Sequence, residues 1–588
     1  MKFRTFGWVQ NPSDFTKLKK TVQVFDPKSD QYKELTNHIV KNVIYFNSDR
    51  KKLQKKLDKN VSEFTYEELV GTSRNKKNKA PKYRKDAIAN SLLQVTILSQ
   101  SAKTKGKLYT DNWTADGFLR WAVSLNFVSY NREKDTFKIT ELGKKLSNSD
   151  DGSSQEMNIL QEAMLSYPPA TRVLSLLATS SKQSLTKFAI GNNLGFVGEK
   201  GFTSYDEGLM IDWLKSVATK EERNNIRRNI EGTSDKYARM ISGWLVKLKF
   251  VEKHTNKYKV GINEYISGFQ TYSITAKGLH AINQANGLSK NKTKKKFVMW
   301  EFLAISNKQD SEQTRDFIRT RRAKIILGLK HHHTISALVN YLKHEGFNMD
   351  ESMLNSELKK LISFGLRIKI VGKTIKLQDN VFGICIPDQS FVPANADIYL
   401  ENMKNHYRKI TNLPERYLEL LDVAFDHNRH QDFEIMTAGI FKDCYGLSSI
   451  HLGGQNKPDG VIYNNNFGII LDTKAYEKGY GMHIDQIDEM CRYIYDNKQR
   501  DIVRQPNEWW NNFDKNIPKD QFYYLWVSGK FLKNFDKQLK NTHYRTNING
   551  GGLEVSQLLL GADAVMKGNL DVNTLPNYMK NNVIKLVI

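Results

Sequence analysis

A chain of 588 residues with a formal net charge of +26 is long enough for several domains and is strongly basic. Its hydrophobic content of 39% suffices for ordinary cores, but no run of 18 or more apolar residues occurs, which excludes a membrane-spanning helix. Three scattered cysteines, Cys385, Cys444 and Cys491, exclude a disulfide framework and a cysteine zinc site. The N-terminal stretch MKFRTFGWVQNPSDF lacks the apolar segment of a signal peptide, so we expect a cytoplasmic protein with no membrane partner.

The positive charge is concentrated in the first two-thirds of the chain. From Asn395 onward, 23 Lys and Arg stand against 24 Asp and Glu, whereas the preceding residues hold 66 basic and 39 acidic side chains. Such an excess favours a polyanionic partner, and nucleic acid is the usual one. The alternative is that the charge only keeps the protein soluble, but its restriction to one part of the chain favours binding.

A helix followed by a short β segment recurs three times in this basic part. The stretches GFLRWAVSLNFVSY, GWLVKLKFVEK and ELKKLISFGLRIKI begin at Gly117, Gly243 and Glu357. The first two continue into similar tails, FKITELGKKL from Phe137 and YSITAKGLHAI from Tyr272. Three helices and a β wing form a winged helix-turn-helix. A repeat could be no more than a stable three-helix core, but together with the charge it favours DNA binding.

Two connectors separate the parts. GLSKNKTKKK is polar and basic, and QDNVFGICIPDQSFVPAN carries two prolines. After the second connector, helices alternate with the strands GVIY, FGIILDT and YYLWVSG, which predicts an α/β domain. We therefore predict an α+β multidomain protein with winged-helix-like subdomains at 1–155, 156–290 and 291–378, a linker at 379–394, and an α/β domain at 395–588.

Two carboxylates and an amine surround a predicted strand pair in KPDGVIYNNNFGIILDTKAY. Asn464 to Asn466 form the turn, so Asp459 at the start of one strand comes near Asp472 and Lys474 at the end of the next. Paired carboxylates suit Mg²⁺, and a lysine beside the metal stabilises charge on a phosphate. The alternative is charges facing solvent, but the apolar strand before Asp472 predicts burial and a cleft.

The stretch KPDG…LDTKAY resembles the PD-(D/E)xK nuclease motif, and the whole chain resembles the FokI-like type IIS restriction endonucleases. Further matching stretches follow in the same order nearly end to end: RTFGWVQNP, DNWTADGFLRWA, SYPPATRVLSLL, EGTSDKYARMISGWL, HLGGQNKPDG, PNEWW and VSGKFLKNF.

The resemblance implies an enzyme that binds a short asymmetric site in double-stranded DNA and makes a staggered, Mg²⁺-dependent cut at a fixed distance outside it. It also implies a C-terminal PD-(D/E)xK cleavage domain that forms a transient homodimer. The resemblance further implies a cognate DNA methyltransferase in the same bacterial restriction–modification system. No direct contact between the two proteins is implied.

The resemblance carries over functional residues to the cleavage domain. Asp459 and Asp472 match the metal-binding carboxylates, Lys474 matches the catalytic lysine, and Glu434 lies where related nucleases often keep an acid. An ordinary exposed helix Glu is the alternative for Glu434. Residues 451–454 resemble a structural turn beside the site.

Asp488 and Arg492 match the dimer contact of the family. They are four residues apart on one predicted helix, so an intrahelical ion pair of about 0.3–0.5 kcal/mol is the alternative.

The positions that match DNA-contacting residues of the family lie in the first two subdomains. They are Gln10, Asn11, Gln100 and Trp113 in the first, and Arg228, Glu231, Lys236 and Arg239 in the second. Lys and Arg suit guanine, Gln and Asn suit adenine, and Glu accepts from an amino group of cytosine or adenine. Arg228 replaces an Asn of the family, and SRNKKNKAP replaces an Arg-bearing segment, so the recognised bases stay open.

Two other functions compete with a site-specific endonuclease. A winged-helix regulator with an inactive nuclease-like domain would not need the complete set of Asp459, Asp472 and Lys474. A structure-specific DNA repair nuclease would not need three basic modules. Both features of the sequence favour the restriction endonuclease.

Overall fold

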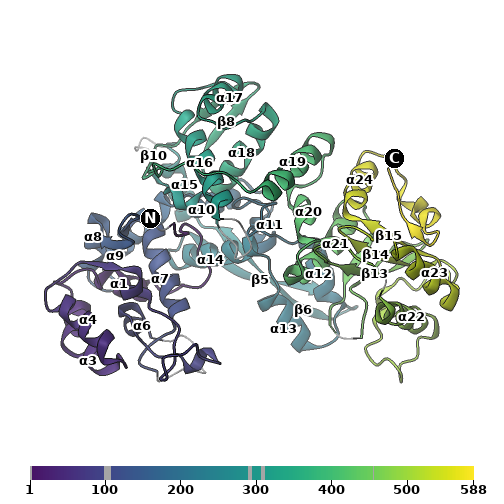
Figure 1. The fold of residues 1–588 in the computed structure, drawn as a ribbon, viewed down its shortest axis with the longest axis horizontal. Helices are drawn as coiled ribbons and strands as arrows, with labels where there is room; N and C mark the ends of the chain where they lie inside the picture. The colour runs from purple at the N-terminus through teal and green to yellow at the C-terminus, as the bar shows by residue number, and fades with distance from the viewer. Residues whose placement is uncertain are drawn as a thin grey trace. The chain divides into compact units, whose positions relative to one another are not determined.

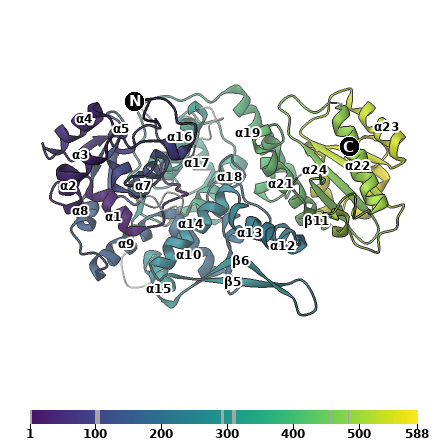
Figure 2. The same cartoon turned by 90° about the horizontal axis from the view of Figure 1, so that it is seen from below.

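The computed structural model describes residues 3–98, 107–288, 295–305, 312–454, 456–481 and 483–587. The chain forms two compact units and passes through each more than once (Figures 1 and 2). Unit 1 consists of Met1–Ser184, Lys236–Lys253 and Tyr272–Pro393, and unit 2 consists of Leu185–Asp235, His254–Thr271 and Ala394–Ile588. Among the described residues, no helix has the length and apolar character needed to cross a membrane.

The first winged helix of unit 1 is built around helix α7 (Asn112–Ser124). Asp111 caps α7 by accepting a hydrogen bond from the backbone N–H of Thr114, and Phe118 and Trp121 bury its apolar face. The sheet of this module has the strand order β1-β3-β2. Its elements and the preceding helices are α1 (Phe15–Gln23), α2 (Asp30–Glu34), α3 (Val40–Val43), α4 (Asn47–Leu57), β1 (Glu63–Thr65), α5 (Tyr66–Val70), α6 (Leu92–Thr96), β2 (Val128–Asn131) and β3 (Thr136–Ile139).

The repeated tails of the sequence adopt the same structure. Thr140 and Thr275 each cap a following helix, through the N–H groups of Gly143 and Gly278. A Cβ atom at Gly143 would lie 2.1 Å from the carbonyl oxygen of Phe127, and one at Gly278 would lie 2.0 Å from that of Phe250. Both glycines therefore allow the helix that contains them to pack closely against the backbone of its own winged-helix module. The helices are α8 (Glu141–Ser147) and α15 (Ala276–Ala285).

The second and third modules follow the predicted pattern of helices and a wing. The second comprises α10 (Pro168–Thr179), β4 (Leu185–Thr186), α11 (Lys187–Gly191), α14 (Thr233–Lys247), β5 (Val251–Lys259) and β6 (Tyr265–Ile274), preceded by α9 (Ser154–Ser166). The third comprises α16 (Glu312–Gly328), α17 (Ile335–His344), α18 (Glu351–Phe364), β8 (Ile368–Val371) and β9 (Thr374–Leu377), beside the strand pair β7 (Lys296–Phe297) and β10 (Val381–Phe382). The predicted fold class is confirmed.

Unit 2 contains a six-stranded sheet with the strands in chain order. They are β11 (Ser448–His451), β12 (Gly460–Tyr463), β13 (Gly468–Lys474), β14 (Phe522–Ser528), β15 (Gly550–Glu554) and β16 (Asn582–Val583). The β11–β12 and β12–β13 pairs are antiparallel, and the remaining pairs are parallel. Parallel neighbours need crossover connections, which the helices after β13, β14 and β15 help to provide.

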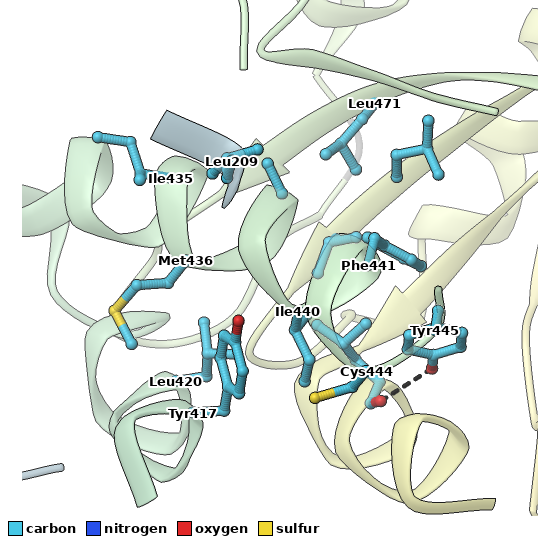
Figure 3. Close-up of a cluster of buried hydrophobic side chains, with 14 of the residues drawn as sticks. Leu209, Tyr417, Leu420, Ile435, Met436, Ile440, Phe441, Cys444, Tyr445 and Leu471 are labelled. Atoms are coloured by element: carbon cyan, nitrogen blue, oxygen red, sulfur yellow. Dashed lines mark hydrogen bonds between the residues drawn. The ribbon is translucent and has the colours of Figure 1, made fainter. Parts of the chain in front are cut away.

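Alternate residues of β13 enter two different cores. Ile469 and Leu471 pack with α21 and α24, as Figure 3 shows for Leu471, whereas Ile470 packs with α22 and α23. Helices therefore cover both faces of the sheet, as in α/β domains. Their bounds are α19 (Asn395–Ile410), α20 (Leu420–Val423), α21 (His430–Asp443), α22 (Ile484–Gln499), α23 (Phe535–Thr546) and α24 (Val555–Met566).

Helix α12 (Glu207–Ser216) belongs to the core of unit 2 although it lies in the predicted subdomain 156–290. Leu209, Met210, Trp213 and Leu214 are buried in one cluster with residues of α21 and the sheet. Figure 3 draws Leu209 close to Ile435 of α21. The following helix, α13 (Lys220–Asn229), contributes Ile226 to the same cluster.

Candidate active site and nucleic-acid interface

The predicted strand pair with its turn forms as expected. The side chain of Asn464 accepts hydrogen bonds from the backbone N–H groups of Asn466 and Phe467, which closes the turn. Gly460 on β12 lies opposite Leu471 on β13, so Asp459 comes next to Asp472 at the end of the pair. The turn and the strand register therefore bring together two carboxylates that are 13 positions apart in the sequence.

Thr473 fixes the carboxylate of Asp459. Its backbone N–H donates to Asp459 Oδ2 at 2.7 Å, and its hydroxyl donates to the same oxygen at 2.8 Å. Thr473 follows Asp472 directly, so one residue of β13 ties the two acidic side chains together. Thr473 was not among the site residues predicted from the sequence, because its contact with Asp459 depends on the strand register.

Asp472 and Lys474 point to the same face of β13, as their spacing predicts. The Nζ atom of Lys474 lies 2.7 Å from Oδ1 of Asp472, and the side chains are only 14% and 4% exposed. Ile469, Ile470 and Leu471 before them are fully buried, which confirms the predicted burial of this strand. The hydroxyl of Ser528 on β14 donates to the Lys474 carbonyl oxygen and closes the end of the ladder.

Burial and mutual repulsion shift the pKa values of these groups. Burial, aided by the charge of Glu434, raises the pKa of Asp459 above its ordinary value. Burial likewise raises the pKa of Asp472, with a further contribution from Asp459, although Lys474 opposes it. Burial alone would lower the pKa of Lys474, but the charges of Asp472 and Asp459 outweigh it and raise the pKa. The site thus concentrates negative charge around one lysine.

Glu434 lies on α21 and is not an ordinary exposed helix Glu. Its side chain is 17% exposed, and its Oε2 atom lies 3.1 Å from Nε2 of His451. His451 ends strand β11, so the expected turn begins only after it, at Gly453 and Gly454, which both have positive φ. The contact between His451 and Glu434 was not predicted, because it joins a helix and a strand that are distant in the sequence pattern.

A second acidic side chain near the site comes from α22. Glu489 accepts a hydrogen bond from the Tyr493 hydroxyl at 2.8 Å, and its charge contributes to the raised pKa of Asp472. Glu489 also accepts a hydrogen bond from Arg492 at 3.3 Å. Nothing in the sequence motif pointed to Glu489, which lies on the helix after the motif.

The donor set fits a divalent cation held by two carboxylates. Asp459 and Asp472 supply hard oxygen ligands, and a cation between them would offset both the burial and the repulsion from Asp459 that raise the pKa of Asp472. Within the described ranges, no cluster of three or more His, Cys, Asp or Glu side chains forms a ready-made metal site. Two protein carboxylates with the remaining positions left to water and substrate are typical of Mg²⁺.

The two predicted dimer residues have other intrachain partners than each other. Asp488 on α22 accepts a hydrogen bond from Arg545 on α23 at 2.6 Å, and Arg492 pairs with Glu489. The expected alternative, an Asp488–Arg492 ion pair within α22, is replaced by these two contacts. Asp488 and Arg492 stay partly exposed, with 59% and 39% of their side-chain areas accessible.

Several predicted DNA-contacting residues gather around one segment of unit 1. The side-chain amide of Gln10 donates to the Tyr237 hydroxyl at 3.3 Å, and Tyr237 stands between Lys236 and Arg239 on α14. Trp244 on the same helix donates to the carbonyl oxygen of Pro12 at 2.8 Å. The segment around Gln10 is therefore bound to α14, although more than 200 residues separate them.

Helix α7 approaches the same segment from the first module. An ideal Cβ at Gly117 would lie 3.9 Å from the Cβ of Asn11, and Trp113 one turn earlier is 58% exposed. Asn11 is exposed, and Lys236 and Arg239 are half-buried. Gln100 lies outside the described residues.

Glu231 and Arg228 differ in exposure. Arg228 is exposed on α13, whereas Glu231 is buried and forms an ion pair with Lys187 at 2.8 Å. A buried, paired carboxylate must change its contacts to reach a base, so Glu231 in this conformation supports the local backbone.

Models of four FokI domains match the chain in order. Subdomain 1 of the recognition domain matches residues 4–149, subdomain 2 matches 156–290, the D3 domain matches 310–373, and the cleavage domain matches 397–585.

Full-length relatives and solved structures agree with the domain models. The type II restriction enzyme FokI of Planomicrobium okeanokoites is 38% identical and covers 99% of both chains. The type II restriction enzyme StsI of Streptococcus sanguinis is 31% identical over 95% of this chain and 92% of its own. A structure of restriction endonuclease FokI and one of FokI bound to DNA match with TM-scores of 0.86 and 0.88, at 37% identity over 99% of this chain and 100% of theirs. The chain therefore belongs to the FokI family of type IIS restriction endonucleases.

Proposed function

We propose that this protein binds a short asymmetric site in double-stranded DNA and makes a staggered, Mg²⁺-dependent cut at a fixed distance outside it. The observation that carries the proposal is the convergence of Asp459, Asp472 and Lys474 at the end of one buried strand pair. Separate domain matches for recognition and for cleavage support a cut that lies away from the recognised bases.

The residues of the site have distinct roles in phosphodiester hydrolysis. Asp459 and Asp472 would hold Mg²⁺, and Thr473 keeps the Asp459 carboxylate oriented. Lys474 is fixed by Asp472 and stabilises negative charge as it develops on the phosphate. The charge of Glu434 acts on Asp459 and, after burial, contributes to the raised pKa of that carboxyl group. A bound Mg²⁺ would supply Lewis-acid polarisation of a phosphate oxygen and activation of water.

The surface around the segment of Gln10 and Asn11 is the proposed DNA-reading surface. Lys236 and Arg239 project from α14, and Trp113 from α7. These residues, with Gln100, Arg228 and Glu231, are the proposed DNA contacts of the recognition domain, for which we keep the boundaries 1–155, 156–290 and 291–378. The excess positive charge before Asn395 supplies the phosphate attraction that holds such a surface on DNA.

Double-strand cleavage requires two catalytic sets, because one set hydrolyses one strand. We assign the contact to α22 in a transient homodimer of the 395–588 cleavage domain, through Asp488 and Arg492. Both side chains are partly exposed and of opposite charge, so each can meet its counterpart on a second copy. A cognate methyltransferase is expected in the same system, because a host must protect its own copies of the site.

Plasmid cleavage by the full-length protein tests the proposal. Asp459→Ala, Asp472→Ala and Lys474→Ala are each expected to lose cleavage with Mg²⁺ while they keep wild-type affinity for the recognised site. Asp520→Ala, which removes an exposed carboxylate of the same unit, is the matched control and should cleave normally. Wild-type cleavage by any of the three variants, or by wild-type protein in EDTA, would refute the assignment.

A further inference from the structure

The imidazole of His451 lies between the acidic site and helix α12. The ring is 1% exposed, and its Nε2 atom lies 3.1 Å from Oε2 of Glu434. The indole ring of Trp213 meets the other side of the imidazole edge-to-face, with 4.3 Å between the ring centroids. An ideal Cβ at Gly453 would lie 3.0 Å from Cε1 of the ring, so a side chain at position 453 would press on the imidazole. Trp213 and the glycine at 453 therefore limit the space in which the imidazole can move.

The backbone of His451 is fixed relative to Asp459. His451 lies opposite Gly460 in the β11–β12 pair, and the backbone N–H of Leu452 donates to the carbonyl oxygen of Asp459 at 2.9 Å. If His451 moved, either the start of β12, next to Asp459, would move with it, or His451 would lose its contact with Glu434.

The hydrogen bonding of the ring is directed at Glu434 alone. In the part of the chain that the structure describes, Nδ1 is buried without a hydrogen-bond partner. A carboxylate accepts, so Nε2 carries the proton and donates to Glu434. The hydrogen bond to Glu434 is therefore the side-chain interaction of the ring that a substitution of His451 would remove.

We propose that His451 is a positioning residue for DNA cleavage, which holds the Glu434 carboxylate toward Asp459, and that Trp213 of α12 holds His451 in turn. The inference rests on the proposed function of Asp459, Asp472 and Lys474. Trp213 lies within the range that matches FokI recognition subdomain 2, 156–290, yet packs in unit 2. A helix outside the cleavage-domain match thus supports the catalytic centre without touching the reacting atoms.

Single-turnover cleavage by the full-length protein, with enzyme and Mg²⁺ saturating, separates this role from a structural one. His451→Gln keeps an N–H near the position of Nε2, whereas His451→Asn has an amide too short to reach Glu434. Loss of such a supporting partner typically costs about 10- to 100-fold in activity, which we expect for His451→Asn. His451→Gln should recover most of the rate, and both variants should bind the recognised site with wild-type affinity.

Trp213 has its own pair of variants. Trp213→Ala should slow cleavage in the same way as His451→Asn, whereas Trp213→Phe keeps an aromatic edge-to-face contact and should cleave faster than Trp213→Ala.

A double-mutant cycle tests whether His451 acts through Glu434. The effects of Glu434→Gln and His451→Asn on the cleavage rate should not be additive in free energy. In a protein that already carries Glu434→Gln, His451→Asn should lower the cleavage rate no further. Three results would each overturn the inference. His451→Asn could cleave at the wild-type rate, His451→Asn and His451→Gln could lose equal rate, or the double variant could lose the product of the two single-variant losses. If Asp472→Ala is inactive while His451→Asn is not, the proposed function stands and only this inference fails.

Discussion

At the scale of single residues, the site depends on charges that are buried and compensated in pairs. Lys474 lies against Asp472, and Thr473 donates twice to Asp459. Removing one partner of a buried pair leaves the other uncompensated, so conservative variants of these residues are informative only when DNA binding is measured alongside cleavage. The same physics governs a second buried charge cluster, in the third winged helix of unit 1.

Glu357 on α18 joins two arginines of α16 in that cluster. Its carboxylate accepts from Arg322 at 2.7 Å and from Arg321 at 3.2 Å, and all three side chains are buried. Burial alone would raise the pKa of Glu357, but Arg322 and Arg321 outweigh it and hold the pKa well below its ordinary value. These two ion pairs tie α18 to α16 across the module.

Glu357→Gln is expected to lower the free energy of unfolding by on the order of 3 kcal/mol at pH 7, because two buried guanidinium groups lose their counter-charge. Folding lowers the pKa of Glu357. The ionised carboxylate therefore contributes its full stabilisation when the pH is above the pKa of the unfolded chain, about 4.3, and this stabilisation is lost as the pH falls below that value. Urea unfolding of wild type and variant, followed by tryptophan fluorescence at pH 7 and at lower pH, should show the difference shrinking. A difference independent of pH would contradict this assignment.

At the scale of elements, local patterns in the sequence predicted the β12–turn–β13 pair and the three winged helices. Alternating strands, turn asparagines and helix caps act over a few residues, and their structures formed as expected. Strand β15 was not predicted because its residues Gly550, Gly551 and Gly552 have low strand propensity. The structure explains them: a Cβ at Gly550 would lie 2.3 Å from the Tyr524 ring, so glycine lets aromatic side chains pack onto the strand.

The contacts that the sequence could not predict join distant segments. Glu434 and His451 meet across a helix and a strand, Asp488 and Arg545 join α22 to α23, and Trp213 reaches unit 2 from another predicted domain. None of these pairs has a local pattern of the kind that i,i+4 spacing provides. The spacing of Asp488 and Arg492 suggested a pair within one helix, and tertiary packing supplied other partners.

Helix α22 provides a prediction about the proposed dimer. Asp488→Arg should lower the rate of double-strand cutting without weakening binding to one site, because like charges then meet across the interface. The double variant with Asp488→Arg and Arg492→Asp restores opposite charges and should recover cutting. The Asp488–Arg545 pair is exposed, so its loss costs at most about 1 kcal/mol of stability. The measurement is the amount of linearised plasmid formed as a function of enzyme concentration. Equal rates for the wild type, the single variant and the double variant would argue against this interface.

At the scale of the whole molecule, charge and chemistry are divided along the chain. The residues before Asn395 carry the entire positive excess, and the site lies in the nearly neutral remainder. The division is not complete, because α12 contributes Leu209 and Trp213 to the core of unit 2. Helix α12, which precedes Asn395 in the sequence, therefore belongs to the same hydrophobic core of unit 2 as the sheet that carries the site.

Fragments of the chain should reflect this division. Residues 1–380 should bind the recognised site with an affinity that falls steeply as salt is added. The logarithm of the binding constant should fall with the logarithm of the salt concentration with a slope of about −0.9 for each phosphate that the fragment neutralises. Residues 390–588 should bind DNA weakly and without sequence preference. That fragment should also melt at a lower temperature than unit 2 in the full chain, because it lacks α12. Binding titrations at several salt concentrations test the two expectations about DNA binding, and thermal melts test the one about stability. Site-specific cutting by residues 390–588 would contradict this division of the chain.

The central claim is that one chain recognises an asymmetric DNA site and cuts outside it with the Asp459, Asp472 and Lys474 set. Sequencing the ends of DNA digested from a random-sequence plasmid library tests this most directly. We predict that every end lies at one fixed distance, on one side, from a single asymmetric sequence, and that Asp472→Ala produces no such ends. Ends scattered without a common sequence, or ends that fall inside the shared sequence, would contradict the account.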